Sequence, residues 1–269
     1  MTLGVLDWGV GGLDLHRRLI EAGLDHNDAI YLSDAGSPPY GTLSEDELAR
    51  RVAACVTSLI HHGCAPVVIG CNAASSVLSH PLVRDAAGEV PVRGVIAPAL
   101  AATLAADPSE VTVLGGARTV ASDVYAAPLR AAGLKVRQHV GQPLSAAVEA
   151  GVVEGPALDA VLDPLLAPIR DTSFLVLACT HYPAVAGPIC ARLPRLERIV
   201  NPAEETARAL AQAWSPFDGA ARPLRYWTTG DPDAARLAAR AAFGVEALFS
   251  RAPEVPSGTR PPPCLRGPH

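Results

Sequence analysis

Short apolar runs alternate with helical patterns along most of the chain, and this alternation limits the fold more than any other feature. Several runs are apolar at every position, which is typical of parallel strands buried on both faces. The alternation predicts an α/β fold of doubly wound parallel sheets and disfavours a sandwich or a helix bundle. We expect strands at residues 3–6, 29–32, 66–69, 92–96, 111–114, 136–140, 174–177, 198–200 and 225–228.

The pattern after residue 43 carries the clearest helix signals. Ser44 and Glu47 have the spacing of a capping box, in which each side chain bonds to the other residue's backbone N–H. An apolar stripe follows through residue 59, and Gly63 ends the pattern. We expect further helices over residues 207–214 and 234–242.

Length and composition exclude several classes of protein. The 269 residues allow one large α/β domain or two of moderate size, with a sizeable core. The 22 basic and 27 acidic residues give a net charge of −5, which argues against a nucleic-acid partner. A hydrophobic share of 49 % excludes a wholly disordered chain. Residues 252–269 are rich in proline, and we expect this tail to be disordered.

The sequence shows no secretory or membrane signal. Its N-terminal stretch has no basic region, and no run approaches the roughly 20 apolar residues that span a bilayer. The six cysteines form no CxxC pair, which argues against a disulfide framework or a zinc site. His61, His62 and Cys64 are neighbours, but adjacent helical residues point in different directions, so we expect no metal there. These features predict a cytoplasmic protein with free thiols and no membrane partner.

Two segments of the chain resemble each other, VVIGCN at residues 67–72 and LVLACT at residues 175–180. Each is a buried strand, then a small residue, a cysteine and a short polar residue. Cys71 and Cys179 therefore lie at strand C-terminal ends, where open α/β sheets form their ligand crevices. A helix start beside each sulfur favours the thiolate and binds carboxylates.

Two thiols that face each other across a crevice suit racemisation without a cofactor. One thiolate removes a proton from a carbon, and the opposite thiol delivers a proton to the other face. A single buried cysteine is more often a small core residue, and we expect that role for Cys55 and Cys190. For Cys71 and Cys179 the repeated context leaves packing and function about equally supported. Cys264 lies in the tail and is a poor candidate.

Three neighbouring segments each allow two interpretations. Asp7, at the end of the first strand, acts as a base partner or caps the next helix. The turn at residues 38–41 holds an anion through its N–H groups or is only a turn. His181 polarises the Cys179 thiol and carries its proton, or it bonds to backbone at a helix start.

Taken together, these motifs resemble the aspartate/glutamate racemase superfamily, and within it most closely the glutamate racemases. The resemblance runs in family order from about residue 3 to residue 249. It rests on DWGVGG at residues 7–12, PYG at 39–41, CNAAS at 71–75, CTHYP at 179–183, AEETA at 203–207 and TTGDP at 228–232.

The resemblance implies two pseudo-symmetric α/β domains with the active site between them. The first would comprise residues 1–96 and 205–251, and the second residues 97–204. Cys71 and Cys179 would be the paired acid and base, assisted by Asp7 and His181 respectively. Glu149 matches a further acidic position near the family's site.

The resemblance also implies how an amino acid would be held. Tyr40 and Gly41, after Pro39, would bind the side-chain carboxylate through backbone N–H groups. The α groups of the amino acid would contact Asn72, Thr119 and Thr180.

Three positions depart from the glutamate racemase pattern. Trp8 replaces a serine that contacts the substrate, Ala73 replaces a threonine, and Gly116 replaces a common threonine. Each lost hydrogen bond costs roughly 0.5–1.5 kcal/mol, and an indole brings roughly 150–250 Å² of surface. Trp8 would fill the pocket, stack on a different substrate or offer a cation–π face to an ammonium group, unless it turns away against Pro38 or Pro39.

We therefore expect a cofactor-independent amino-acid racemase with glutamate as the default substrate. The first alternative is a racemase or epimerase of a different or larger amino acid, because of Trp8 and Ala73. The second is a catalytically silent homologue that binds a protein. A decarboxylase is disfavoured, since related decarboxylases often keep one of the two cysteines. Family members often form dimers, which makes a homodimer the implied assembly.

Overall fold

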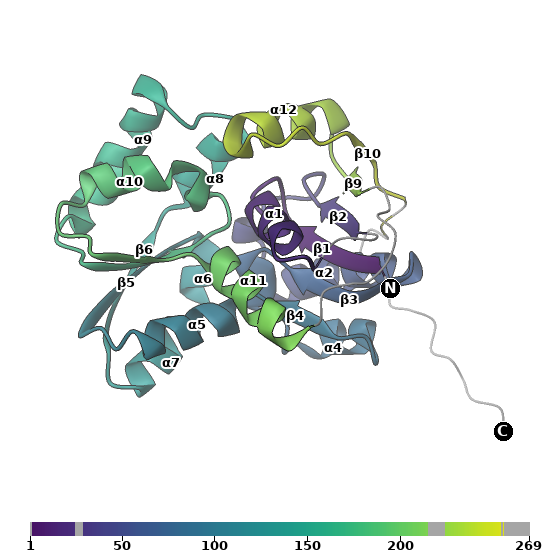
Figure 1. The fold of residues 1–269 in the computed structure, drawn as a ribbon, viewed down its shortest axis with the longest axis horizontal. Coiled ribbons are helices and arrows are strands. Elements are labelled where there is room, and N and C mark those ends of the chain that lie inside the picture. Colours follow the sequence, from purple (N-terminus) through teal and green to yellow (C-terminus); the bar gives the residue numbers. More distant parts are fainter. Residues whose placement is uncertain (1, 25–28, 215–223, 254, 256–269) are drawn as a thin grey trace.

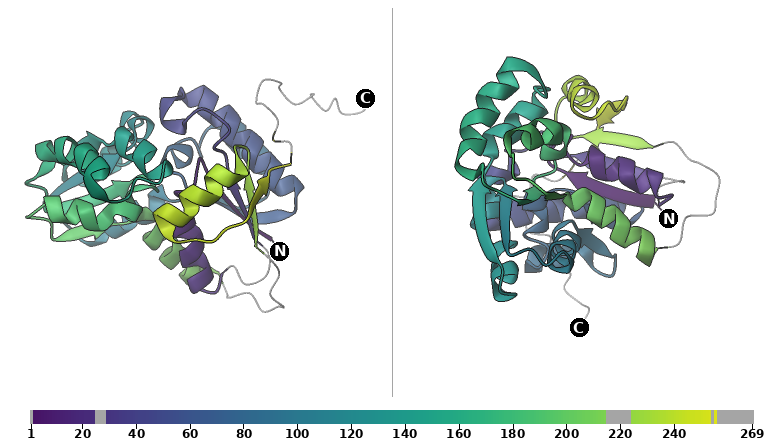
Figure 2. Two further views of the ribbon diagram at one scale, coloured as in Figure 1. Left: turned by 90° about the horizontal axis from the view of Figure 1, so that it is seen from above. Right: turned by 60° about the vertical axis from the view of Figure 1, so that its left-hand side comes forward.

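The structure is a computed structural model that describes residues 2–24, 29–214, 224–253 and 255. Within these residues the strands form two sheets, and every strand pair is parallel. The six-stranded sheet has the order β10-β9-β2-β1-β3-β4 and the four-stranded sheet the order β6-β5-β7-β8. Figures 1 and 2 show one lobe built on each sheet. The predicted α/β fold with parallel sheets is confirmed.

The strands of the larger sheet are β1 (Thr2–Asp7), β2 (Ala29–Ser33), β3 (Cys64–Ile69), β4 (Val92–Gly94), β9 (Arg225–Thr228) and β10 (Phe249–Arg251). Those of the smaller sheet are β5 (Glu110–Gly115), β6 (Lys135–Val140), β7 (Phe174–Ala178) and β8 (Arg198–Val200). The two domains implied above, with their boundaries, stay a prediction.

Helices cover both faces of the larger sheet. On one face lie α2 (Glu45–His61) and α4 (Pro81–Ala87), and on the other α1 (Leu13–Glu21), α11 (Pro202–Ala213) and α12 (Pro232–Phe243). Alternate strand residues supply the two cores, as Val67 and Ile69 point to the α2 side and Val68 to the α1 side. This is why the strands read as continuous apolar runs.

The smaller sheet is covered in the same way. One face packs against α8 (Gln142–Glu149), α9 (Gly155–Leu166) and α10 (Ala186–Arg192), and the other against α5 (Ile96–Ala105) and α7 (Ala126–Ala131). Short elements complete the fold: α3 (Asn72–Ser75), α6 (Ala117–Ala121), η1 (Tyr40–Thr42), η2 (Ala167–Ile169) and η3 (Tyr182–Val185). Figure 1 shows α8 of one lobe near α12 of the other.

Side-chain caps fix several helix starts. The predicted capping box is present at α2, because Ser44 accepts from the Glu47 N–H and the Glu47 carboxylate accepts from the Ser44 N–H. Asn201 caps α11 and Asp231 caps α12, and in both helices proline occupies the first position. These two helices therefore begin five and two residues earlier than their apolar patterns predicted.

One strand prediction was wrong in detail, and one strand was not predicted. The strand expected over residues 92–96 ends at Gly94, since Ile96 already begins α5 and Pro98 fits the first turn of that helix. The edge strand β10 was not predicted, because Phe249–Arg251 is too short to show a pattern. Most of the tail, with Cys264, lies outside the described residues.

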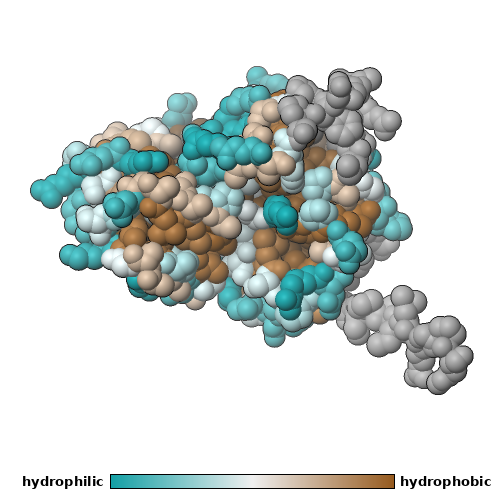
Figure 3. Space-filling model, turned by 60° about the horizontal axis from the view of Figure 1, so that its bottom comes forward, coloured by the Kyte–Doolittle hydropathy of each residue, from teal (hydrophilic) through white to brown (hydrophobic). Residues whose placement is uncertain are grey.

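The surface is mixed in character. On the face shown in Figure 3, apolar residues gather in one area on each lobe, separated by more polar residues. No helix in the described part of the chain is long and apolar enough to cross a membrane. The homodimer and the cytoplasmic location stay predictions.

Candidate active site

One cavity lies where the C-terminal ends of strands from both sheets meet. Its lining includes Cys71, which follows β3 of the larger sheet, and Cys179, which follows β7 of the smaller one. The cavity offers about 80 Å³, several times the roughly 10–15 Å³ that a single water molecule requires. The structure therefore brings both repeated segments to one small cavity.

The Cys71 thiol stands on the wall that belongs to the larger sheet. Cys71 is the N-cap of α3 and is only 9 % exposed. Burial raises the pKa of this thiol well above its ordinary value, and the nearby Asp7 carboxylate adds to the rise. The N–H groups of Ala73 and Ala74 oppose the shift but do not outweigh burial. The helix start alone thus does not make Cys71 a thiolate, contrary to the expectation from sequence.

Asp7 lies on the same wall, completely buried at the end of β1. Its Oδ1 atom accepts the N–H of Trp8 at 2.6 Å, and its Oδ2 atom has no hydrogen-bond partner among the described residues. Gly12, not Asp7, is the N-cap of α1, so the capping interpretation is wrong. Burial raises the pKa of Asp7 from 3.8 to about 6. Asp7 therefore lines the cavity as a carboxyl group that accepts a proton near neutral pH.

The Cys179 thiol stands on the opposite wall, beside an imidazole. The Cys179 Sγ atom lies 3.7 Å from Nδ1 of His181, and Nε2 of His181 lies 2.7 Å from Oε2 of Glu149. Burial by itself lowers the pKa of His181, but its hydrogen bonds to Cys179 and Glu149 raise it well above 6.5. Both ring nitrogens thus face side chains, and the interpretation of His181 as a backbone-bonded residue is wrong.

Glu149 lies behind the imidazole and does not line the cavity. It is the last residue of α8, and its Oε2 atom also accepts the N–H of Val10 at 3.1 Å. Burial opposes ionisation, yet the bonds from His181 and Val10 hold the pKa of Glu149 below its ordinary value. A Cβ atom at Gly9 would lie 2.3 Å from the same oxygen, so the glycine-rich loop after β1 allows Glu149 to approach.

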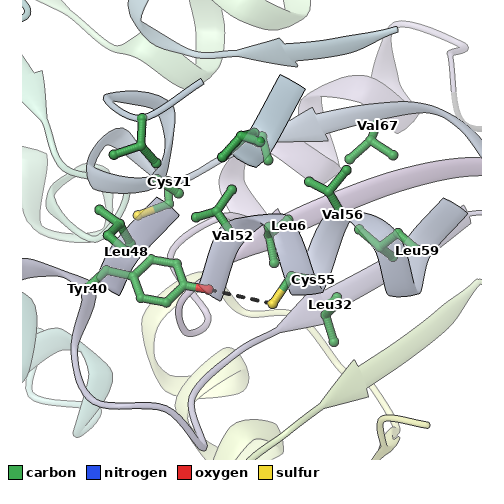
Figure 4. Packing of buried hydrophobic residues seen from close by; sticks show 14 of the residues in the cluster. Leu6, Leu32, Tyr40, Leu48, Val52, Cys55, Val56, Leu59, Val67 and Cys71 are labelled. Atoms are coloured by element: carbon green, nitrogen blue, oxygen red, sulfur yellow. Dashed lines mark hydrogen bonds between the residues drawn. The ribbon is translucent and has the colours of Figure 1, made fainter. Parts of the chain in front are cut away.

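The turn at Tyr40 closes the cavity from the larger lobe. The Tyr40 ring points into the core, where it lies beside Leu48 and turns its hydroxyl toward Cys55 (Figure 4). That hydroxyl donates to the buried Asp34 carboxylate at 2.8 Å, and Asp34 also binds Arg51. This network anchors the turn, while the first N–H groups of its 3-10 helix have no partner inside the turn.

The other predicted contacts are also at the cavity. Asn72, Thr119 and Thr180 line it and are nearly fully buried. The Oδ1 atom of Asn72 accepts the Tyr125 hydroxyl at 2.7 Å, whereas its Nδ2 atom has no partner within the described ranges. Pro39 and Gly41 complete this part of the lining.

Comparison with known proteins identifies the family. Residues 14–210 match the Asp/Glu/Hydantoin racemase family. The glutamate racemase of Mycobacterium leprae is 35 % identical over 253 residues, which cover 89 % of this chain and 91 % of that protein. The chain belongs to the Asp/Glu/Hydantoin racemase family. The predicted resemblance and the predicted enzyme class, an isomerase of the racemase type, are confirmed.

Solved structures of the family share this fold. A glutamate racemase isoform from Bacillus anthracis matches with a TM-score of 0.83 at 28 % identity, covering 93 % of this chain and 96 % of that one. The Escherichia coli glutamate racemase in complex with L-glutamate and the activator UDP-MurNAc-ala matches with a TM-score of 0.73 at 27 % identity, covering 93 % and 98 %.

The three departures from the glutamate racemase pattern all face the cavity. Trp8 lines it, and its indole N–H donates to the Ser37 carbonyl at 3.2 Å while its ring centroid lies 6.2 Å from that of His181. Trp8 therefore does not turn away from the site. Ala73 and Gly116 line the cavity as well.

Two polar residues of the site were missed by the sequence analysis. Gln142 lines the cavity, and its Oε1 atom accepts the Ala117 N–H at 3.0 Å. Ser145 also lines it, with its Oγ atom 3.3 Å from the Cys179 Sγ atom. The signal was present, because Gln142, Ser145 and Glu149 recur at intervals of three and four residues and so share one face of α8.

The remaining predicted residues lie away from the site. Cys55 is buried in the core as expected, but Cys190 is exposed because the short helix α10 buries Ile189 instead. Cys64 belongs to the buried strand β3. Among the described residues no group of three or more His, Cys, Asp or Glu side chains is arranged to hold a metal ion.

Proposed function

We propose that this chain interconverts the two enantiomers of glutamate by moving a proton between two thiols, Cys71 and Cys179. One observation carries the proposal: the two cysteines follow strands of different sheets and line the same small cavity. An α-carbon held between them has one sulfur on each face. Relatives named glutamate racemase, one of them solved with L-glutamate, support this choice of substrate.

Each turnover moves one proton out and one proton in. A thiolate on one wall takes the α-hydrogen as a proton, and the electron pair of that C–H bond stays on the substrate as a carbanion. The thiol on the opposite wall then donates its proton to the other face of the carbon. The enzyme ends with the two protonation states exchanged, and the reverse reaction uses the same groups in opposite order.

The other residues of the cavity have complementary roles in this proposal. Asp7 supports Cys71, and the pair of His181 and Glu149 supports Cys179. The unpartnered Nδ2 group of Asn72 suits the α-carboxylate, together with the Thr119 and Thr180 hydroxyl groups.

The side-chain carboxylate would be bound at the Pro39–Gly41 turn. The N–H groups at the start of that turn, from Tyr40 and Gly41, are suitable donors. Gln142 lies beside them, because a Cβ atom at Gly41 would meet its Oε1 atom first and would lie 3.1 Å from its Nε2 atom. A Cβ atom at Gly116 would lie 3.1 Å from the Oε1 atom of Gln142. The amide of Gln142 therefore occupies the direction that a threonine at position 116 would take, and its Oε1 atom accepts the Ala117 N–H there.

One observation favours a second candidate, a racemase or epimerase of a different or larger amino acid. The Trp8 indole lines the cavity, and Ala73 provides no hydroxyl beside it. Such a wall suits an apolar or aromatic group better than a short acidic chain.

The test is hydrogen exchange at the α-carbon. The purified protein is incubated with L-glutamate, D-glutamate and a panel of other amino acids in deuterated water, and loss of the α-proton signal is followed by NMR. Exchange of glutamate supports the first candidate, and exchange of another amino acid alone supports the second. Silence across the panel would contradict both and favour a protein-binding role.

Single substitutions test the thiol pair. Cys71→Ser and Cys179→Ser are each expected to abolish racemisation, because a hydroxyl is a far weaker acid than a thiol. Cys190→Ser is the matched control, since its thiol is exposed and remote from the cavity. Racemisation retained by either active-site variant would overturn the two-thiol mechanism.

A further inference from the structure

The Cys179 sulfur has a serine hydroxyl beside it. The Oγ atom of Ser145 lies 3.3 Å from the Cys179 Sγ atom, and Ser145 is 6 % exposed. The helix α8 presents Ser145 one turn before Glu149, so a single face of this helix serves both Cys179 and its imidazole. We propose that Ser145 is a positioning residue that holds Cys179 as the thiolate of the resting enzyme. This inference rests on the proposed thiol pair.

The groups around Cys179 fall into two sets. On its own wall, the His181 imidazole is held by Glu149, and Ser145 adds a hydroxyl donor. The buried Tyr182 ring lies close by, and burial raises the pKa of its hydroxyl well above 10, so it stays neutral. Across the cavity stand Asp7 and Cys71, which oppose a second negative charge. A hydroxyl and an imidazole therefore contact the Cys179 sulfur, whereas the Cys71 sulfur has the Asp7 carboxylate near it and the N–H groups of Ala73 and Ala74 beside it.

A serine hydroxyl suits both states of the sulfur that it contacts. Toward a thiolate, the O–H group of Ser145 donates a hydrogen bond to the charged sulfur. Once Cys179 has taken the α-proton of the substrate, the same oxygen accepts a hydrogen bond from the thiol. A hydroxyl can thus follow the proton by rotation alone, whereas an alanine methyl can do neither.

The first test reads the charge of Cys179 directly and needs no turnover. The whole protein is labelled with iodoacetamide from pH 5 to pH 9, and the labelling rates of Cys179 and Cys71 are measured by peptide mass spectrometry. In Ser145→Ala the half-maximal pH for Cys179 is expected to rise by about one pH unit, equivalent to a tenfold loss of thiolate at low pH. Labelling of Cys71 is expected to stay unchanged or to become easier.

Two further variants separate this role from a structural one. Ser58→Ala removes an equally buried serine from α2, remote from the cavity, and should match the wild type. Ser145→Thr keeps the hydroxyl, so its half-maximal pH for Cys179 should lie close to that of the wild type. An unchanged half-maximal pH for Cys179 in Ser145→Ala would overturn the inference. An equal shift in Ser58→Ala would overturn it as well.

The kinetic test follows if an amino acid is racemised. In Ser145→Ala the acidic limb of the pH profile of kcat/KM is expected to move to higher pH by the same shift of about one unit as the labelling curve. The two enantiomers have equal free energy, so kcat/KM is equal in both directions and one direction suffices. Because labelling does not depend on turnover, a protein that racemises nothing would contradict the proposed function while the labelling result still decides the role of Ser145.

Discussion

Removing the charge of Glu149 tests whether the His181–Glu149 pair supports Cys179. The His181 Nε2 to Glu149 Oε2 distance is 2.7 Å, and the two side chains are 3 % and 19 % exposed. A hydrogen bond to a charged group contributes roughly 1.5–3 kcal/mol, which corresponds to a 10- to 150-fold change in kcat/KM. Glu149→Gln keeps an acceptor oxygen, so we expect a loss of about tenfold. Glu149→Ala leaves the imidazole unpaired, and we expect about a hundredfold loss.

The pKa shifts of His181 and Glu149 determine at which pH the loss of stability is greatest and in which direction the pH profile moves. The raised pKa of His181 stabilises the folded protein below pH 6.5, and that stability is lost as pH rises through the folded pKa. The lowered pKa of Glu149 stabilises it above pH 4.5, and that stability is lost as pH falls through the folded pKa. The stability lost in Glu149→Gln is thus greatest between these limits. The basic limb of kcat/KM should move to lower pH, because His181 loses the partner that keeps it protonated.

Racemisation followed by polarimetry from pH 5 to pH 10, with urea denaturation at each pH, measures both effects. Glu154→Gln is the control, since that carboxylate is exposed at the start of α9. Gly9→Ala should reproduce the loss while Glu149 itself is kept, because the new methyl group would collide with the Glu149 carboxylate and displace it. An unchanged basic limb in Glu149→Gln would refute the assignment of Glu149 to the imidazole.

Two more predictions concern the cavity walls. Asp7→Asn is expected to stabilise the protein by up to about 3 kcal/mol at pH 8 and by almost nothing at pH 3, because the rise of the Asp7 pKa from 3.8 to about 6 opposes folding only when the carboxyl is ionised. Urea denaturation at the two pH values measures this difference, and equal stabilisation at both would contradict the prediction. Gln142→Glu is expected to raise the KM for glutamate tenfold or more, because it places a second carboxylate beside Gly41; Gln212→Ala on the exposed side of α11 is the control, and an unchanged KM would remove Gln142 from the substrate site.

Most of the fold followed from the sequence because its signals are local. Buried parallel strands show as apolar runs, and the α2 capping box lies within four residues of chain. The errors lie where local signals are weak: β10 has three residues, and the seven residues of α10 do not define which side is buried, so Cys190 was misplaced. The starts of α11 and α12 depend on single capping residues outside the apolar pattern.

The site was less predictable because it depends on contacts between distant segments. Gly9 is separated from Glu149 by 140 residues, and only the folded chain shows that the glycine leaves room for that carboxylate. The face of α8 defined by Gln142, Ser145 and Glu149 is visible as a spacing of three and four, but the sequence does not say that it faces Cys179. The two lobes look alike around their cysteines, yet α8 places its Ser145 hydroxyl beside Cys179. The chemical difference between the two cysteines therefore comes from the helix packed beside each strand end, and the repeated motif does not reveal it.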